Sequence, residues 1–392
     1  MLERLQPQSP DALLALIKLY RDDERAEKID LGVGVYRTDD GDTPVFSAIK
    51  EAESRLVREQ DSKSYLGPEG DMGFVHALMP HIFGKDPTRK GRIEGMQTPG
   101  GTGAVRLALA LAKSAGATRI LMGTPSWPNH KQIIDDLGLD TVDFPHAKSD
   151  GTANLDALLT ALGDAGEGDA VLLHASCHNP TGVDYDIDQW EAIAAKVKAR
   201  GVLAIVDCAY QGLGQGMEED AAGLRLMVDA LPEMLLAYSC DKNFGLYRDR
   251  VGALYAMLPD AGALDKLFSN ANALARAAWS MPPDHGAAAV RYVLRDPGLT
   301  QMWLDELKEM RERMRVVRSQ LAAADNRVGG LELAPLANQN GLFAMLKLDK
   351  DQIQALRDDH AVYMAGSGRI NVAGLTSGNV ERFIAALEQV AA

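Results

Sequence analysis

The sequence predicts an α/β fold with a mostly parallel central sheet, because short apolar runs alternate with helical segments between about residues 140 and 256. The run 170–175 is mostly apolar and the run 202–206 is continuously apolar, as strands buried on both faces are. Two further runs, 234–238 and 251–256, flank a short polar stretch. Ligands of such open sheets bind beyond the carboxyl ends of the strands, so the polar residues after each run are the first candidates for a site.

The other elements follow from periodicity, taken in chain order. Ser9-Pro10-Asp11 predicts a helix start, and apolar residues at helical spacing continue to Tyr20. Glycines interrupt the apolar run 31–36, which indicates close approach to a ligand or to another part of the backbone. The further predicted elements are helices over residues 46–60, 188–199 and 299–321 and a strand over residues 119–123.

Length and composition describe an ordinary globular protein and exclude several classes. The 392 residues correspond to about two or three domains. The net charge of −14 argues against a nucleic-acid-binding surface, which would be basic. Cys177, Cys208 and Cys240 lie in or beside apolar runs without a CxxC pair, which predicts reduced thiols in a cytoplasmic protein. Neither a signal peptide nor a membrane-spanning segment is expected.

The most informative stretch lies between the runs 234–238 and 251–256 and contains Lys242. A lysine is almost never fully buried without a partner, and one chemistry that needs a desolvated amine is Schiff-base formation with a carbonyl. Pyridoxal phosphate combines such a carbonyl with an anion, and Ser239 and Arg250 flank Lys242 as phosphate partners would. The alternative is a surface loop with a solvated lysine.

Two other segments also suit such a cofactor. Residues 97–104 form a Gly/Thr-rich turn that opens a helix, and free N–H groups there suit a phosphate, although an ordinary helix N-cap is the alternative. The segment is not a P-loop, because the GK[ST] ending is missing. Trp127 and His130 lie in a Pro-bounded loop after a strand, where they suit a flat aromatic ligand. A tryptophan packed in the core is the commoner alternative.

Polar residues that follow predicted strands converge on one edge of the sheet. Asp207 facing a pyridine nitrogen would keep it protonated, and Asn179 and Tyr210 would hydrogen-bond the phenolic oxygen of the ring. Lys242 would move a proton between the substrate Cα and the cofactor. A helix N-cap is the structural alternative for Asp207.

The residues together resemble the class I aminotransferases of the aspartate and aromatic amino-acid group, which are fold-type I pyridoxal phosphate enzymes. The segments that carry the resemblance are residues 31–36, 97–104, 126–130, 174–182, 207–212, 242–252, 282–286 and 368–374. It implies a large cofactor-binding domain over residues 45–300. Residues 1–44 would form an N-terminal arm and part of a small α+β domain, which residues 301–392 would complete.

The resemblance also implies a role for each cofactor residue. Lys242 would hold pyridoxal phosphate covalently, Asp207 would meet the ring nitrogen, and Trp127 would stack on the ring with His130 behind it. The catalytic residues would be Lys242, Asp207, Tyr210 and Trp127. The cofactor would be bound by Gly101, Thr102, Trp127, Asn179, Asp207, Tyr210, Ser239, Lys242 and Arg250, and by Tyr65 from the neighbouring subunit of a homodimer.

For the substrate, the resemblance implies that Arg369 clamps the α-carboxylate as a bidentate fork. Arg276 from the neighbouring subunit would pair with a side-chain carboxylate. Gly34 and Phe343 would line the pocket, with Trp127 and Asn179 also contacting the substrate. No metal is expected.

Two positions depart from the family pattern. Asp241 stands where the family usually has serine, and its charge should weaken phosphate binding unless Arg250 or Arg248 compensates. Met281 replaces the asparagine of strict aspartate enzymes, which removes a polar partner near Arg276 and favours aromatic donors.

The sequence thus predicts a ping-pong aminotransferase that moves the amino group of Phe, Tyr, Trp or aspartate to 2-oxoglutarate. The alternatives are a strict aspartate aminotransferase and a decarboxylase or lyase of the same fold. A non-catalytic regulator would need an added DNA-binding domain, and a hydride-transfer enzyme would need the glycine fingerprint that this sequence lacks.

Overall fold

The computed structural model describes residues 1–6, 12–85 and 91–391, so the predicted helix start at Ser9-Pro10-Asp11 lies outside the described residues. The chain divides into two compact units. The larger consists of Pro44–Glu312 and Gln339–Gly341. The smaller consists of Met1–Thr43, Arg313–Asn338 and Leu342–Ala392.

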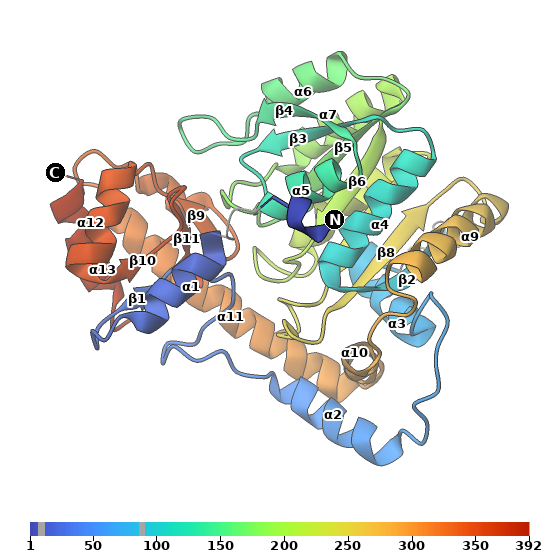
Figure 1. The fold of residues 1–392 in the computed structure, drawn as a ribbon, viewed down its shortest axis with the longest axis horizontal. Coiled ribbons are helices and arrows are strands. Elements are labelled where there is room, and N and C mark those ends of the chain that lie inside the picture. Colours follow the sequence, from blue (N-terminus) through green and yellow to red (C-terminus); the bar gives the residue numbers. More distant parts are fainter. Residues whose placement is uncertain (7–11, 86–90, 392) are drawn as a thin grey trace. The chain divides into compact units, whose positions relative to one another are not determined.

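A seven-stranded sheet forms the centre of the larger unit, in the order β2-β8-β7-β6-β5-β3-β4 (Figure 1). The neighbours from β7 to β4 pair in parallel, whereas β8 is antiparallel to both β2 and β7. The prediction of a mostly parallel sheet is therefore confirmed. The strands are β2 Ile93–Pro99, β3 Arg119–Thr124, β4 Asp140–Pro145, β5 Asp169–His174, β6 Leu203–Cys208, β7 Met234–Ser239 and β8 Val251–Met257.

Helices pack around this sheet (Figure 1). Helix α4 lies against β6, β7 and β8. Its buried apolar residues share one core cluster with those of the strands, such as Ile205, Leu235 and Leu254. The helices of this unit are α2 Ser47–Glu59, α3 Met72–Phe83, α4 Gly100–Ser114, α5 Pro128–Asp136, α6 Leu155–Gly163, α7 Ile187–Arg200, α8 Ala222–Ala230, α9 Ala261–Ala278 and α10 His285–Arg295.

Local sequence signals explain where several of these helices begin and end. Asp186 and Gln189 form a capping box at the start of α7, in which each side chain bonds the other residue's backbone N–H. Gly201 ends the helix with a left-handed backbone, φ 65°. The predicted turn over residues 97–104 is shorter than expected, because β2 runs to Pro99 and α4 begins at Gly100. Gly100 reverses the chain there with φ +70°.

The smaller unit combines helices with two short two-stranded sheets. Strand β1 pairs in parallel with β10, and β9 pairs antiparallel with β11. Its core gathers apolar side chains from both ends of the chain, such as Ile29 and Leu387. Its elements are α1 Ala12–Asp22, β1 Ile29–Asp30, β9 Phe343–Met345, α12 Lys350–His360, β10 Val362–Tyr363, β11 Arg369–Asn371 and α13 Val380–Val390.

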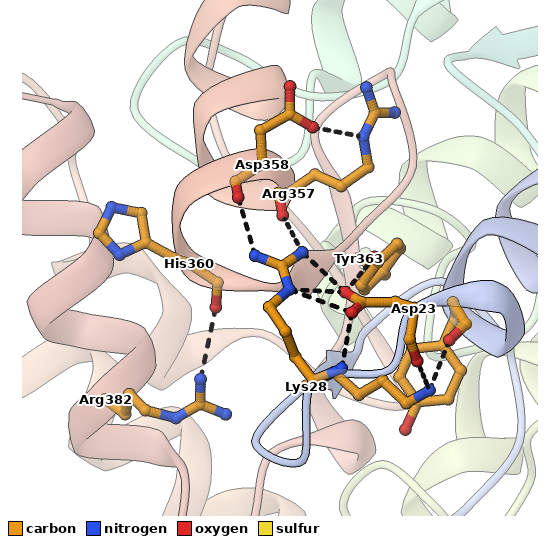
Figure 2. A network of polar contacts seen from close by, with 9 residues as sticks. Asp23, Lys28, Arg357, Asp358, His360, Tyr363 and Arg382 are labelled. Atoms are coloured by element: carbon orange, nitrogen blue, oxygen red, sulfur yellow. Dashed lines mark hydrogen bonds and ion pairs between the residues drawn. The ribbon is translucent and has the colours of Figure 1, made fainter.

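A polar network joins the turn after α1 to the end of α12 (Figure 2). Arg25 donates to the carbonyl oxygens of Arg357 at 2.9 Å and Asp358 at 2.8 Å, and also bonds the Asp23 carboxylate. The hydroxyl of Tyr363 donates to the same carboxylate. An arginine at the last carbonyls of a helix satisfies groups that have no partner inside the helix. The network therefore fixes the N-terminal segment onto the C-terminal part of the same unit.

The long helix predicted over residues 299–321 is confirmed as α11, Pro297–Ala323. The domain boundary expected at residue 300 falls inside this helix, whose residues up to Glu312 belong to the larger unit. Trp303 helps to hold the first part of α11 in the larger unit. Its indole stacks on Phe244 with ring centres 4.3 Å apart and donates to the Asn243 carbonyl at 2.6 Å. In the described parts of the chain, none of the helices combines the length and apolarity needed to cross a membrane.

We expect Trp303→Phe to lower the free energy of unfolding by about 1–3 kcal/mol, because the buried Asn243 carbonyl loses its donor while ring stacking is kept. Trp303→Ala should cost about 3–5 kcal/mol, since it also leaves a cavity. Urea titration followed by circular dichroism measures both. The neighbouring exposed Met302→Ala is the control and should stay within about 0.5 kcal/mol. Unchanged stability of Trp303→Phe would show that the hydrogen bond contributes nothing.

Candidate active site

One pocket of the larger unit lies at the carboxyl ends of β5, β6 and β7. It brings together eight of the residues that the sequence predicted: Gly101, Thr102, Trp127, Asn179, Asp207, Tyr210, Ser239 and Lys242. Its lining also includes His174, Ala209 and Asp241, none of which was among the predicted site residues.

Strand register explains why these side chains meet. His174, the last residue of β5, pairs with Asp207 of β6, and Asp207 pairs with Ala237 of β7. Ser239 ends β7 two residues further on. Polar groups that are distant in sequence therefore share one edge of the sheet.

Asp207 is a buried strand residue and not the helix N-cap that was the alternative. Its Oδ2 lies 2.9 Å from Nε2 of His130, whose other ring nitrogen lies 2.9 Å from the Ser126 hydroxyl. Burial by itself favours the neutral acid, but the bond from His130 and the charge of Lys242 keep the pKa of Asp207 below its usual value. Asp207 is therefore ionised at neutral pH and gives the pocket a negative charge.

The Lys242 amine lies over the ring of Tyr210, 5.3 Å from its centre. Burial lowers the pKa of Lys242, against the opposing effect of the nearby Asp241 and Asp207 carboxylates. A lowered pKa increases the fraction of neutral amine, which is the nucleophilic form. The alternative of a solvated lysine in a surface loop is therefore wrong.

Asn179 and Tyr210 lie next to each other in the pocket. The amide nitrogen of Asn179 donates to the Tyr210 hydroxyl at 3.4 Å. The Asn179 amide oxygen is buried and has no hydrogen-bond partner among the residues that the structure describes. Such an orphaned acceptor costs free energy unless a ligand or water supplies a donor, so this corner of the pocket fits a polar ligand.

The other end of the pocket fits a phosphate group. Helix α4 starts there at Gly100. Its N-cap residue Pro99 makes no side-chain hydrogen bond to the first turn, so the helix does not have the ordinary N-cap that was the alternative. A Cβ on Gly101 would lie 2.8 Å from the Cβ of Ser239, so only glycine lets the helix approach this close. Free N–H groups, the positive end of the helix and the Ser239 hydroxyl could together hold a phosphate.

A row of buried and partly buried histidines lies next to Asp207, and sequence reasoning missed most of it. The rings of His130, His174 and His178 follow one another at centre distances of 5.1 and 4.3 Å, and His146 stacks on His178 at 3.5 Å. Burial lowers the pKa of His146 to about 4 and that of His174 to about 3, which keeps both neutral at pH 7. His174 could have been found from the sequence, because it is a polar residue near the end of the predicted run 170–175, as Asp207 is after the run 202–206.

Two nitrogens and one oxygen of this region are close enough together to hold a metal ion. The ligand atoms of His130, His174 and Asp207 lie within 4.8 Å of one another. The hydrogen bond between His130 and Asp207 already uses two of these groups, so the arrangement is explained without an ion.

The pocket does not include the two residues expected to act across a subunit boundary. The Tyr65 side chain is 94% exposed. Arg276 is also exposed and donates to the hydroxyl of Ser280.

Three predicted substrate residues lie together in the smaller unit. The Arg369 guanidinium lies 4.5 Å from the ring centre of Phe343 and donates to the Gly32 carbonyl at 2.9 Å. A Cβ on Gly34 would lie 2.7 Å from the Phe343 ring. This confirms the close backbone approach that the glycines of residues 31–36 indicated.

Comparison with known proteins agrees with this chemistry. The sequence profile of the family described as aminotransferase class I and II matches residues 26–387. A tyrosine aminotransferase of Rhizobium meliloti is 50% identical over 377 residues, 96% of each chain. An aspartate aminotransferase of Escherichia coli is 39% identical over 385 residues, 97% of each chain.

Solved structures agree as well. An aromatic amino acid aminotransferase with 3-indolebutyric acid has a TM-score of 0.95 and 38% identity, with 100% of both chains covered. The aromatic-amino-acid aminotransferase of Burkholderia pseudomallei, covalently bound to pyridoxal phosphate, has a TM-score of 0.96 and 33% identity over 100% of both chains.

The buried His146 should make the protein less stable in mild acid. Its pKa is about 4 in the folded state against 6.5 for a free histidine, so between these values only the unfolded chain binds the proton. Unfolding is therefore favoured as the pH falls, by about 2 kcal/mol at pH 5. In His146→Phe, the loss of unfolding free energy between pH 7 and pH 5 should be smaller by that amount.

Urea titrations at the two pH values measure this difference. Tyr185→Phe is the matched control, because its ring contacts His146 but a phenol does not titrate in this range. Equal pH dependence of His146→Phe and the wild type would contradict the prediction.

Proposed function

Because the chain belongs to the class I and II aminotransferases, which use pyridoxal phosphate, we propose that it moves the amino group of an aromatic amino acid or aspartate to 2-oxoglutarate. The reaction is ping-pong: the donor leaves as a 2-oxo acid before the acceptor binds. One observation carries the proposal, namely the pocket that joins the Lys242 amine, the Asp207 carboxylate and the start of α4.

Several residues in and beside the pocket would have a task in this reaction. The bound cofactor would supply an electron sink for the negative charge that develops at the substrate Cα. Asp207 would keep the ring nitrogen protonated, with His130 holding its carboxylate in place. Lys242 would hold the cofactor between turnovers and move the proton at Cα, which its lowered pKa supports. Asn179 and Tyr210 would hydrogen-bond the ring oxygen, and Trp127 would stack on the ring.

The phosphate and carboxylate groups have separate binding residues. Gly101, Thr102, Ser239 and Arg250 bind the phosphate. Arg369 binds the substrate α-carboxylate as a bidentate fork, and its contacts with Gly32 and Phe343 hold the guanidinium in a fixed orientation.

The substitution at Met281 supports a preference for aromatic donors. Its sulfur accepts the Leu66 N–H at 3.1 Å, while the Arg276 guanidinium donates to the neighbouring Ser280. At position 281 a thioether thus stands where asparagine would offer Arg276 an amide, and Ser280 provides the polar contact instead. With one such contact, Arg276 can move aside for an aromatic side chain. The names of the relatives, which include tyrosine, aromatic and aspartate aminotransferases, agree with a broad donor range.

We further propose a homodimer in which each subunit completes the other's site. Tyr65 of the partner subunit binds the phosphate, and Arg276 of the partner subunit binds a side-chain carboxylate. Exposed apolar side chains support an interface in this part of the chain, because Leu66, next to Tyr65 in the sequence, is 41% exposed and Val57 near the end of α2 is 76% exposed. The cytoplasm is the proposed location, since all three cysteines are buried thiols.

The half-reaction should be visible in the absorbance spectrum of the purified protein without any oxo acid. Addition of phenylalanine, or separately of aspartate, should convert the aldehyde-form band to the pyridoxamine-form band, with phenylalanine acting at lower concentration. Lys242→Ala is the control: it should still bind the cofactor, without a covalent link, and lose conversion by at least about a thousandfold.

Other outcomes would reject specific parts of the proposal. If Lys242→Ala converts the aldehyde-form band at the wild-type rate, Lys242 does not move the proton at Cα. Response to aspartate alone would identify a strict aspartate enzyme, and release of carbon dioxide without a 2-oxo acid would identify a decarboxylase.

Met281→Asn should shift the donor preference towards aspartate. The amide would give Arg276 of the same subunit a polar neighbour, and this arginine is the one proposed to bind the side-chain carboxylate in the partner subunit's site. We therefore expect the ratio of kcat/KM for aspartate to that for phenylalanine to rise about five- to tenfold. Steady-state kinetics with both donors measure the ratio. Met281→Leu, which stays apolar, should leave it unchanged. An unchanged ratio in Met281→Asn would rule out this position as a determinant of specificity.

A further inference from the structure

The Asp241 carboxylate is an unusual neighbour for a phosphate site. It lines the same pocket as Thr102 and Ser239, and its side chain is only 4% exposed. It forms an ion pair with Arg250, and its Oδ1 accepts the Val251 N–H at 3.1 Å. The backbone N–H of Asp241 donates to the Ser239 hydroxyl at 3.2 Å. Two of the proposed phosphate ligands are therefore already bonded to Asp241.

The ion pair also lies against the first residue of α4. A Cβ on Gly100 would lie 2.6 Å from Nη2 of Arg250 and 3.0 Å from Oδ2 of Asp241. This is the positive end of the helix, where an anion is stabilised. The Asp241 carboxylate therefore lies at the start of α4, where the phosphate of the cofactor would also be stabilised.

The two members of the pair differ in their freedom to move. The Arg250 side chain is 40% exposed and can turn towards a second anion, whereas the Asp241 carboxylate is enclosed. Burial raises the pKa of the Asp241 carboxyl, against the opposing effects of Lys242 and Arg250. The charge of Asp241 thus depends on these two cations, and an arriving phosphate must share Arg250 with it.

We propose that Asp241 competes with the phosphate group of the cofactor for Arg250 and the start of α4, so that this enzyme binds the phosphate weakly. The aldehyde form of the cofactor is still held by its bond to Lys242. The amine form has no carbonyl for Lys242 to react with, so the phosphate contacts carry more of its binding, and it leaves more readily than it would beside serine. This inference rests on one part of the proposed function, the binding of pyridoxal phosphate, and does not depend on which amino acid is the donor.

The binding of pyridoxamine phosphate to the full-length apoenzyme tests this inference without any turnover. Isothermal titration calorimetry on Asp241→Asn and Asp241→Ser should show at least tenfold tighter binding than on the wild type, which corresponds to 1.4 kcal/mol. Adding Arg250→Gln to Asp241→Asn should remove most of this gain. Asp249→Asn is the matched control, since it removes the same charge beside Arg250 in the sequence but not from the ion pair, and should change binding less than twofold.

Pyridoxamine without the phosphate shows where any effect arises. Its affinity should change less than twofold in every variant, because the competition concerns only the phosphate. Binding of pyridoxamine phosphate that is unchanged or weaker in both Asp241 variants would overturn the proposal, and weaker binding would show that Asp241 orients Arg250 for the phosphate. An equal gain for pyridoxamine would also overturn it. Circular dichroism confirms that each variant is folded, and failure of a donor to react leaves these results unaffected.

Discussion

Hydrogen bonding between the parallel strands β5, β6 and β7 determines where the polar groups of the pocket lie. His174 pairs with Asp207, and Asp207 pairs with Ala237, two residues before Ser239. Because side chains alternate between the faces of a strand, a slip of one residue would turn Asp207 away from the pocket. The apolar residues that hold this register, although they touch no ligand, are therefore as necessary to the site as the charged groups are.

Buried charge is the second constraint, and the pocket balances it locally. Asp207 is compensated by the bond from His130 and by the charge of Lys242, and Asp241 by Arg250 and the Val251 N–H. Loss of one partner would leave the other charge buried and uncompensated, which costs far more than an exposed pair would. The histidines behind Asp207 add hydrogen-bonding groups without adding charge, since burial keeps His146 and His174 neutral at pH 7.

Much of this arrangement could be predicted from the sequence, because it depends on local patterns. The apolar runs indicated β5 to β8, and the residues after them indicated Asp207, Asn179 and Lys242. Contacts that depend on the tertiary fold could not be predicted. His146 and His178, for example, stack although they belong to different segments. For Asp241 the sequence named Arg250 and Arg248 as possible partners, and the ion pair forms with Arg250, whose backbone is left-handed, φ 55°. The position along α11 at which the chain passes from one unit to the other could not be predicted, because the helical periodicity continues unbroken across Glu312.

The two departures from the family pattern, Asp241 and Met281, leave the contacts of Asp207 and Lys242 in the middle of the pocket unchanged. Asp241 acts on the phosphate end through Arg250, and Met281 contacts the backbone of Leu66, next to Tyr65. Asp207 keeps its bond to His130, and the Lys242 amine still lies over Tyr210. In the proposed reaction, proton transfer at Cα depends on Asp207, Lys242 and Tyr210, whereas retention of the cofactor and choice of donor depend on Asp241 and Met281. A chain can therefore keep the reaction of its family while it changes how tightly it holds the cofactor and which amino acids it accepts.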